Sequence, residues 1–407
     1  MTVFKGRQVR SRWWLICLVS TLPGSVTAQR PVSLTQAIDI ALTTSPVSAR
    51  GRADSAAGVA GLSLAEAWPN PSASVGYSKA IPQWHGVLDF PIDYPWVRGN
   101  RTHAAEAGQQ AAGYRSQLTR ATIRFQVEVA YVQGLAAQER AHTARSNARD
   151  ADTLLHLTEV RRDAGDASDL DVMLAGMSAG QLANAALSDS AAAVAAIVEV
   201  QRLMGLPGDS ARIVLSDRLT LPPPDSLVMT GPSLPVAAAE AELNARQGEL
   251  ELEKKRPIPG PSLQLGLEGG DPTGAEPGLL PTIGLSFPLP LFNQNGGAIA
   301  LANANRDVAE ADLVQTRLET GTALAGAQRD LQVALDRAQR GQGLAETAAQ
   351  VAGLARTAYA EGAVSLPYVL EAQRGAREAS AQLTADIAAA LTARAALRFF
   401  TTSGVRP

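Results

Sequence analysis

Few side chains in this sequence are spaced for chemistry. His103 and Glu106 lie three residues apart in a stretch predicted to be helical, so they share one helix face and could offer two ligands to a metal ion. Two ligands do not make a metal site, and a solvated helix surface is the more common interpretation of such a pair. The remaining histidines have no comparable partners in the sequence; they are His85, His142 and His156.

The sequence also lacks the motifs of the common enzyme classes. It contains no phosphate-binding P-loop, no dinucleotide fingerprint and no nucleophile elbow. Its single cysteine, Cys17, lies in a segment that we expect to be removed, which excludes disulfides, thiol chemistry and thiolate metal sites from the processed chain. We therefore predict that the protein is not an enzyme and holds no cofactor and no resident metal.

The N-terminus has the layout of a secretory signal peptide, which we place at residues 1–28. Four basic residues precede an apolar run over 13–19, and small residues at 26–28 suit cleavage before Gln29. An uncleaved membrane anchor is less favoured, because about 20 apolar residues are needed to span a bilayer. Cys17 follows Ile16, where a lipid-anchor signal would need a small residue. Removal of the leader changes the formal net charge from −3 to −3 − 4 = −7, and nothing indicates a nucleic-acid partner.

The rest of the chain repeats one unit. Phe90-Pro91 recurs as Phe287-Pro288, and Gly165 of DAGDASDLDV recurs as Gly362 of AEGAVSLPYV, both at an offset of 197 (287 − 90 and 362 − 165). A shared spacing across alanine-rich sequence predicts one supersecondary unit used twice, which must bury its apolar faces against copies of itself.

Proline placement predicts very long helices in each repeat. No proline lies between Trp96 and Leu206, and only Pro367 interrupts 291–406, so we expect one long helix over about 98–162 and breaks at Gly165 and Gly362. Shorter segments over about 46–67 and 235–256 would stack on the short arms that follow the breaks. A seven-residue pattern of small residues in the second repeat predicts a coiled-coil seam, with a further row on another side; a simple two-helix hairpin stays the alternative. The seam residues are Leu324, Leu331, Ala338, Ala345 and Ala352, with Ala327, Ala334, Gly341, Ala348 and Ala355; the further row is Leu344, Val351 and Ala358.

Between the helices the apolar period changes from seven to two. Alternating residues over 72–78, 263–268 and 282–289, and a less regular strand expected over 87–94, predict β-hairpins at about 71–95 and 261–290. A transmembrane barrel with a watery lumen and a soluble half-buried hairpin both alternate in this way. Aromatic residues gather around the first hairpin and resemble a membrane-interface girdle, in a chain with only 4% aromatics. They are Trp68, Tyr77, Trp84, Phe90, Tyr94 and Trp96. Because four strands cannot close a barrel and open edges do not survive in lipid, we expect a homotrimer with twelve strands.

At this point the sequence resembles the TolC-like outer-membrane factors of tripartite efflux pumps, over nearly the whole processed chain. The resemblance rests on Ser33-Leu34-Thr35-Gln36-Ala37-Ile38 with Ser45-Pro46, on Trp68-Pro69-Asn70-Pro71, and most specifically on the run from Phe287 to Ala298. That last phrase resembles the branch that serves heavy-metal cation pumps of the resistance-nodulation-division class. The resemblance implies an α+β membrane protein, a trimeric twelve-stranded β-barrel continued by a long periplasmic α-helical barrel. It gives a first repeat over 29–207, an inter-repeat equatorial segment over 208–232, a second repeat over 233–402 and a tail over 403–407.

The resemblance also suggests two functional regions. In the family the loops equivalent to the two glycine turns are periplasmic tips that meet the adaptor protein, although turn chemistry alone would also explain the glycines. The docking candidates are Gly165, Asp166, Ala167 and Ser168, with Gly362, Ala363, Val364 and Ser365. Relatives carry constricting carboxylates six and nine residues after the second glycine, where this chain has Tyr368 and Glu371. Asp169 and Asp171 occupy the start of the corresponding first-repeat helix, where helix capping explains them at least as well as gating.

The sequence thus predicts a passive exit duct in the outer membrane of a Gram-negative bacterium, extending into the periplasm. Its expected partners are two further copies of itself, a periplasmic adaptor, an inner-membrane resistance-nodulation-division pump and outer-membrane lipid. Metal cations are the favoured cargo. Export of drugs, or of proteins by a type I system, uses the same architecture and stays open, as does a periplasmic coiled-coil scaffold without a pore.

Overall fold

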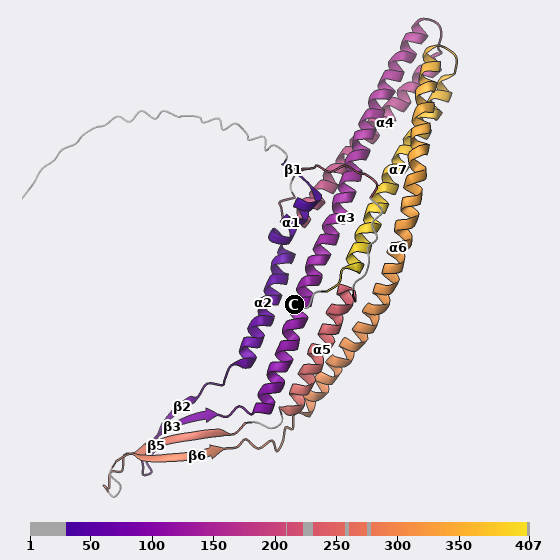
Figure 1. Cartoon of the computed structure of the whole chain (residues 1–407). Helices are drawn as coiled ribbons and strands as arrows, with labels where there is room; N and C mark the ends of the chain where they lie inside the picture. Colours follow the sequence, from indigo (N-terminus) through magenta and orange to yellow (C-terminus); the bar gives the residue numbers. More distant parts are fainter. Residues whose placement is uncertain (1–29, 209, 223–230, 257–259, 275–277, 405–407) are drawn as a thin grey trace, which may run out of the picture.

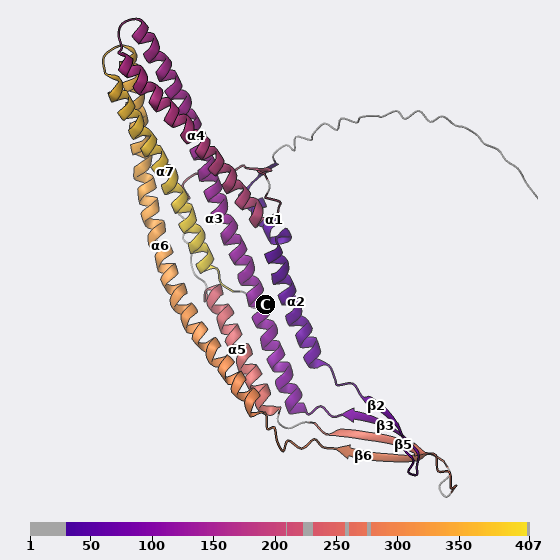
Figure 2. The same ribbon diagram turned by 180° about the vertical axis from the view of Figure 1, so that it is seen from behind.

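The computed structural model describes residues 30–208, 210–222, 231–256, 260–274 and 278–404, so the predicted signal peptide lies outside the described residues. The molecule is long and narrow, with parallel columns of helices and a small sheet at one end (Figures 1 and 2). The helices are α1 (Leu34–Thr44), α2 (Pro46–Glu66), α3 (Pro95–Asp163), α4 (Asp169–Leu203), α5 (Leu234–Lys255), α6 (Gly296–Ala360) and α7 (Leu366–Thr401). The strands are β1 (Arg30–Val32), β2 (Ser72–Tyr77), β3 (Trp84–Pro91), β4 (Ile213–Leu215), β5 (Ser262–Gly269) and β6 (Leu280–Ser286).

The predicted long helices are confirmed. Helix α3 has 69 residues and α6 has 65, which at 1.5 Å per residue gives lengths of about 104 and 98 Å. Helix α3 begins at Pro95, three residues before the predicted start, because proline suits the first helical position, where no N–H is needed. The repeat offset also holds in the structure: α4 begins at Asp169 and α7 at Leu366, and 366 − 169 = 197.

The short arms are completed by end-to-end stacking, as predicted. The Thr44 hydroxyl, just before α2, donates to the Met204 carbonyl at the end of α4 across 2.6 Å. In the second repeat the Leu234 N–H of α5 donates to the Thr402 carbonyl after α7 across 2.9 Å. Each repeat therefore contributes one long helix and one column built from two pieces. Helix α1 and the short parallel pair β1–β4, which the sequence did not predict, lie at the level of the first of these joints.

Alanine dominates the contacts between the columns. Helix α6 packs along α7 and α3 packs along α4, and the predicted seam residues of α6 are all buried or half-buried. Small side chains let the helix axes approach closely over the whole length of the columns. The second row behaves differently, because Leu344 and Val351 are exposed in the single chain, at 62% and 44%. Larger side chains gather near β1 and β4, where Tyr131, Val127 and Met204 are almost fully buried.

The four longer strands form one antiparallel sheet in the order β2-β3-β5-β6. The second strand differs from its prediction: β3 covers 84–91 rather than 87–94. It starts earlier because Tyr77 pairs with Trp84 across the hairpin, and it ends earlier because Tyr94 is already the N-cap of α3. Strand β3 pairs with β5, so the two repeats join in the middle of the sheet, which leaves β2 and β6 at its edges.

Candidate functional site

The two predicted docking loops are tight helix reversals at the end of the molecule opposite the sheet (Figure 1). Gly165 has φ 85° and Gly362 has φ 79°, a region that side-chain-bearing residues rarely adopt. The first loop closes α3 with bonds from the Gly165 N–H to the Arg162 carbonyl and from the Asp166 N–H to the Arg161 carbonyl. This pair of bonds is a Schellman motif, and the second loop repeats it.

The loops are exposed and held rigidly at their bases. Ser168 caps α4 together with Asp171, whose carboxylate accepts from the Ser168 N–H (3.1 Å) and hydroxyl (2.9 Å). In the second loop Pro367 lies in the first turn of α7 and Leu366 is buried. The remaining docking candidates are exposed or half-buried around these anchors: Ala167, Ala363, Val364 and Ser365. The capping role of Asp171 is therefore visible, whereas docking stays a prediction.

The structure places the two loops side by side, which the sequence alone did not predict (Figures 1 and 2). The Arg161 guanidinium of α3 lies 4.6 Å from the ring centre of Tyr359 on α6 and donates to the Tyr359 carbonyl. The buried Tyr359 hydroxyl donates to the Thr158 hydroxyl across 3.2 Å. Leu154 and Val369 pack in the same cluster. The first hairpin of helices is thus tied to the second just behind the tips.

The predicted aperture residues lie on the first turn of α4 and on the first two turns of α7. Glu371 is 71% exposed, and its carboxylate is 3.6 Å from the Arg374 guanidinium, which also approaches Glu378 at 3.4 Å. Tyr368 is exposed on the same turn, and Asp169 is exposed on α4. Within the described part of the chain no polar contact joins the α4 pair to the α7 pair. The sequence pointed to the carboxylate of Glu371 but not to its arginine neighbour.

The sheet has one apolar and one polar face. Register pairs Val75 with Gly86, Leu88 with Leu265 and Leu265 with Ile283, so these side chains share one face. The opposite face carries polar groups, among them the directly paired His85 and Glu268, whose Nδ1 and Oε1 are 3.5 Å apart. Val75 and Ile283 are 79% and 77% exposed. A complete apolar face open to the surroundings needs a partner surface or lipid.

The predicted interface aromatics form two groups at the two ends of the strands. Tyr77 and Trp84 meet at the hairpin end, with ring centres 5.0 Å apart. At the helix end Tyr94 stacks on Trp96 (4.4 Å), Trp68 lies against the Arg98 guanidinium (4.5 Å), and Phe90 is close to the end of β3. The eight residues of β3 span about 26 Å at 3.3 Å per residue, which at the strand tilt of outer-membrane barrels, about 35–45°, gives a height of about 18–21 Å, somewhat less than their roughly 25 Å apolar band.

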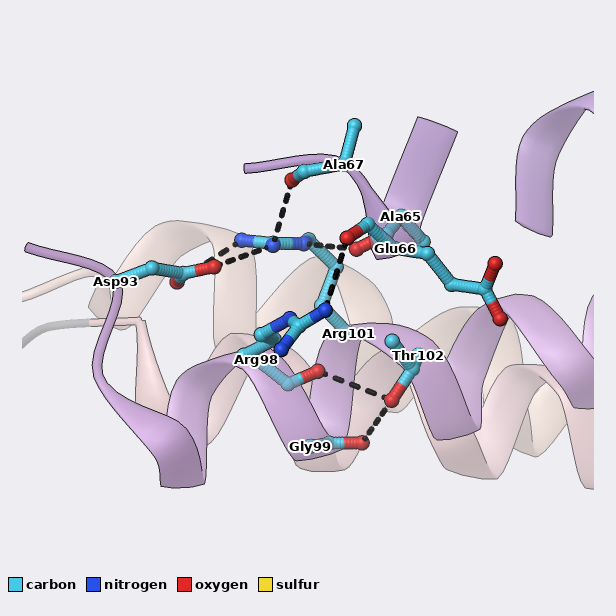
Figure 3. A network of polar contacts seen from close by, with 8 residues as sticks. All are labelled: Ala65, Glu66, Ala67, Asp93, Arg98, Gly99, Arg101 and Thr102. Carbon is cyan, nitrogen blue, oxygen red and sulfur yellow. Dashed lines mark hydrogen bonds and ion pairs between the residues drawn. The ribbon is translucent and has the colours of Figure 1, made fainter. Parts of the chain in front are cut away.

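A polar junction that the sequence did not predict joins the sheet to the helices (Figure 3). Arg101 binds the Asp93 carboxylate with two nitrogens, at 2.6 and 3.2 Å, while its Nε donates to the Ala65 carbonyl at 2.8 Å. Arg98 donates to the Glu66 carbonyl at the end of α2. The Asp93 side chain is only 6% exposed. The junction fixes the angles at which α2 leads into β2 and β3 leads into α3.

His103 and Glu106 line a polar groove between α3 and α5. The described residues contain no group of three or more side chains that could hold a metal ion. Helix α4 is long and apolar enough to cross a membrane by composition, but it lies along α3 as one of the columns.

Comparison with known proteins identifies the architecture. Residues 232–402, essentially the whole second repeat, match the family described as outer membrane efflux protein. The crystal structure of the outer membrane protein VceC of Vibrio cholerae superposes with a TM-score of 0.73 at 18% identity, over 90% of this chain and 95% of that one. The second repeat of the chain is homologous to outer membrane efflux proteins. Proteins of that family are channels of the outer membrane rather than enzymes, which places this chain in that membrane with its helical columns in the periplasm.

Curated relatives in this efflux family cover most of the chain. The cobalt-zinc-cadmium resistance protein CzcC of Cupriavidus metallidurans is 28% identical over 77% of this chain and 76% of its own length. The pyoverdine export outer membrane protein OpmQ of Pseudomonas aeruginosa is 30% identical over 72% of this chain and 65% of its own. The predicted family resemblance and the predicted channel fold, a β-sheet continued by long helical columns, are thereby confirmed, and the homotrimer stays a prediction.

Proposed function

We propose that this chain forms, as a homotrimer, the passive outer-membrane exit duct of a tripartite efflux system. The four-stranded sheet carries the proposal. One face is apolar and exposed, the other is polar, and among the described strands the outer edges of β2 and β6 have no partner. Unpaired backbone groups are too costly in hydrocarbon, so the sheet must be closed by further copies.

Chain geometry supports three copies arranged in a ring. Three sheets of four strands give twelve, an even number within the range of bacterial barrels, and β6 of one copy would run antiparallel to β2 of the next. The helical edges fit the same closure. Helix α4 packs mainly on α3, and its exposed Met173, Leu187 and Val194 follow a seven-residue spacing. Leu344 and Val351 of α6 offer a matching exposed row for the neighbouring copy.

The exposed tips and the aperture complete the proposed duct. The loops around Gly165 and Gly362 present short side chains on rigid bases, which suits close approach of the helices of an adaptor. The residues from 366 to 371 would surround the periplasmic opening, with Glu371 and Arg374 contributed by each copy. An inner-membrane pump would supply the energy, because the chain carries no nucleotide-binding motif.

Heavy-metal cations are the proposed cargo. CzcC, a cobalt-zinc-cadmium resistance protein, supports this choice. OpmQ, which exports pyoverdine, keeps a larger organic cargo as the second candidate. Growth of a deletion strain on graded zinc, cobalt and cadmium, with and without a plasmid copy of the gene, distinguishes them. Metal tolerance that does not change on deletion would contradict the metal assignment.

Single-channel recording tests the duct itself. Purified protein added to a planar bilayer should give discrete conductance steps, because the polar face of the sheet lines the closed barrel. A periplasmic scaffold without a pore would give none. Absence of steps from protein that stays soluble without detergent would overturn the duct.

A further inference from the structure

A pocket of about 360 Å³ lies half-way along the columns, beside the joint between α7 and α5. Figure 1 shows this level, with α3 on one side of the joint. Part of its wall is apolar: Phe125 of α3 and Phe399 of α7 have ring centres 5.4 Å apart. Leu42 and Leu234 add aliphatic surface from α1 and α5. The volume lies within the range of pockets that hold small organic ligands.

The rest of the wall is positively charged. Arg120, Arg124 and Arg398 line the pocket, and Glu128 is the only carboxylate among the described lining residues. Glu128 is already paired with Arg398, because its carboxylate accepts a hydrogen bond from the Arg398 guanidinium across 2.9 Å and is only 9% exposed. The pocket therefore holds more positive charge than its own carboxylate can balance.

Arg120 and Arg124 carry the excess positive charge of the pocket. They lie one helical turn apart on α3, where like charges repel each other. Within the described part of the chain neither guanidinium has a hydrogen bond or an ion pair. Each retains several N–H donors suited to the two oxygens of a carboxylate or to the oxygens of a sulfonate.

We propose that this pocket binds a small organic anion that has a flat apolar body and one carboxylate or sulfonate group. The body lies against Phe125 and Phe399, and the anionic group lies between Arg120 and Arg124. Most of the lining comes from α3 and the α5–α7 column, which lie inside the protomer, whereas the edges available for ring closure are β2, β6, α6 and the column of α1, α2 and α4. Ring closure would therefore leave most of the lining uncovered.

Isothermal titration calorimetry on the full-length protein in lipid nanodiscs tests the site, with 2-naphthoate as the probe. The neutral 2-naphthamide tests the need for charge, and inorganic sulfate tests the need for an apolar body. We expect saturable naphthoate binding, with the amide and sulfate each at least about tenfold weaker, the size of one charge-assisted hydrogen bond.

The double variant Arg120→Gln/Arg124→Gln should weaken naphthoate binding about tenfold or more, and Phe399→Leu should weaken it several-fold. A matched control is Arg140→Gln/Arg145→Gln, which removes two exposed charges from α3 outside the pocket and should leave binding unchanged. Circular dichroism verifies that every variant is folded. Absence of saturable binding, equal binding of sulfate, or equal loss in the control would overturn the proposal. Because binding is measured without conductance, this outcome is independent of the duct function.

Discussion

Arg101→Ala should destabilise the folded protein more than Asp93→Ala, although both changes break the same ion pair. In the Arg101 variant the Asp93 carboxylate, only 6% exposed in the wild-type protein, loses its partner, and loss of one member of a buried pair costs about 3–5 kcal/mol. The Arg101 side chain is itself 31% exposed, so water can reach the junction and the lower end, about 3 kcal/mol, is the better expectation.

Removal of the other partner, Asp93, should cost less free energy of unfolding. In Asp93→Ala the guanidinium keeps its bond to the Ala65 carbonyl and reaches solvent, so a loss of about 1–2 kcal/mol is expected. The double variant should be no less stable than Arg101→Ala, because it no longer buries an unpaired charge. The resulting double-mutant cycle should give a coupling energy of about 1–2 kcal/mol.

Equilibrium urea titration of the detergent-solubilised protein, followed by tryptophan fluorescence, measures these differences. Trp68 lies against Arg98 in the same junction and should report its loss. Arg115→Ala serves as the control, because Arg115 pairs with Glu242 at 2.9 Å but is 52% exposed and should cost less than about 1 kcal/mol. Equal losses in the two single variants, or additive losses in the double variant, would refute the reasoning.

Three further changes test other parts of the molecule. Gly165→Leu and Gly362→Leu should cost about 1–2 kcal/mol each through their positive φ rather than through a clash, and should abolish efflux while protein still reaches the outer membrane. Unchanged metal resistance would argue against docking, and Gly165→Asn, which tolerates this backbone, is the control. Glu371→Ala should shift the reversal potential away from cation selectivity, while Arg374 keeps Glu378 at 3.4 Å as a partner; an identical potential in a salt gradient would place Glu371 away from the aperture. Tyr131→Phe should cost about 0.5–1.5 kcal/mol by removing the 2.8 Å bond to the Val32 carbonyl. Burial raises the pKa of Tyr131 to about 12, so its stabilising effect is present below pH 10 and is lost towards pH 12, and the phenylalanine variant should lack that alkaline loss in urea titrations.

Features with a regular period could be predicted from the sequence. The seven-residue seam of α6, the alternation along β5 and the offset of 197 between Gly165 and Gly362 all follow from local chain geometry. These patterns led to the long helices, the strands and the two-piece columns. They did not predict the limits of β3, which depend on pairing with β2 and on the N-cap at Tyr94.

Contacts between distant segments could not be predicted in the same way. Arg161 and Tyr359 are far apart in the chain, and only the meeting of the α3–α4 hairpin with the α6–α7 hairpin at the tips brings them together. The pocket between Arg124 and Arg398 depends on where α7 ends against α3. Such contacts produce no periodic pattern in the sequence. Each depends on a single arginine, and the sequence has many arginines on exposed helix faces.

Both repeats connect the sheet to a long helix, but they use different residues for it. A side chain at the start of each long helix, α3 or α6, binds the end of the short helix beside it, α2 or α5. This bond keeps the angle between the strands and the helices the same in every copy around the ring. In the first repeat Arg98 donates to the Glu66 carbonyl; at the equivalent position, 295 − 98 = 197, the Asn295 amide donates to the Glu253 carbonyl across 2.9 Å. Asn295 also has φ 63°, which asparagine tolerates better than most residues, so the second repeat enters its long helix through a left-handed N-cap, whereas the N-cap of α3 is extended. The two junctions thus share a bond but differ in backbone, and a closed ring would alternate two kinds of joint between barrel and columns.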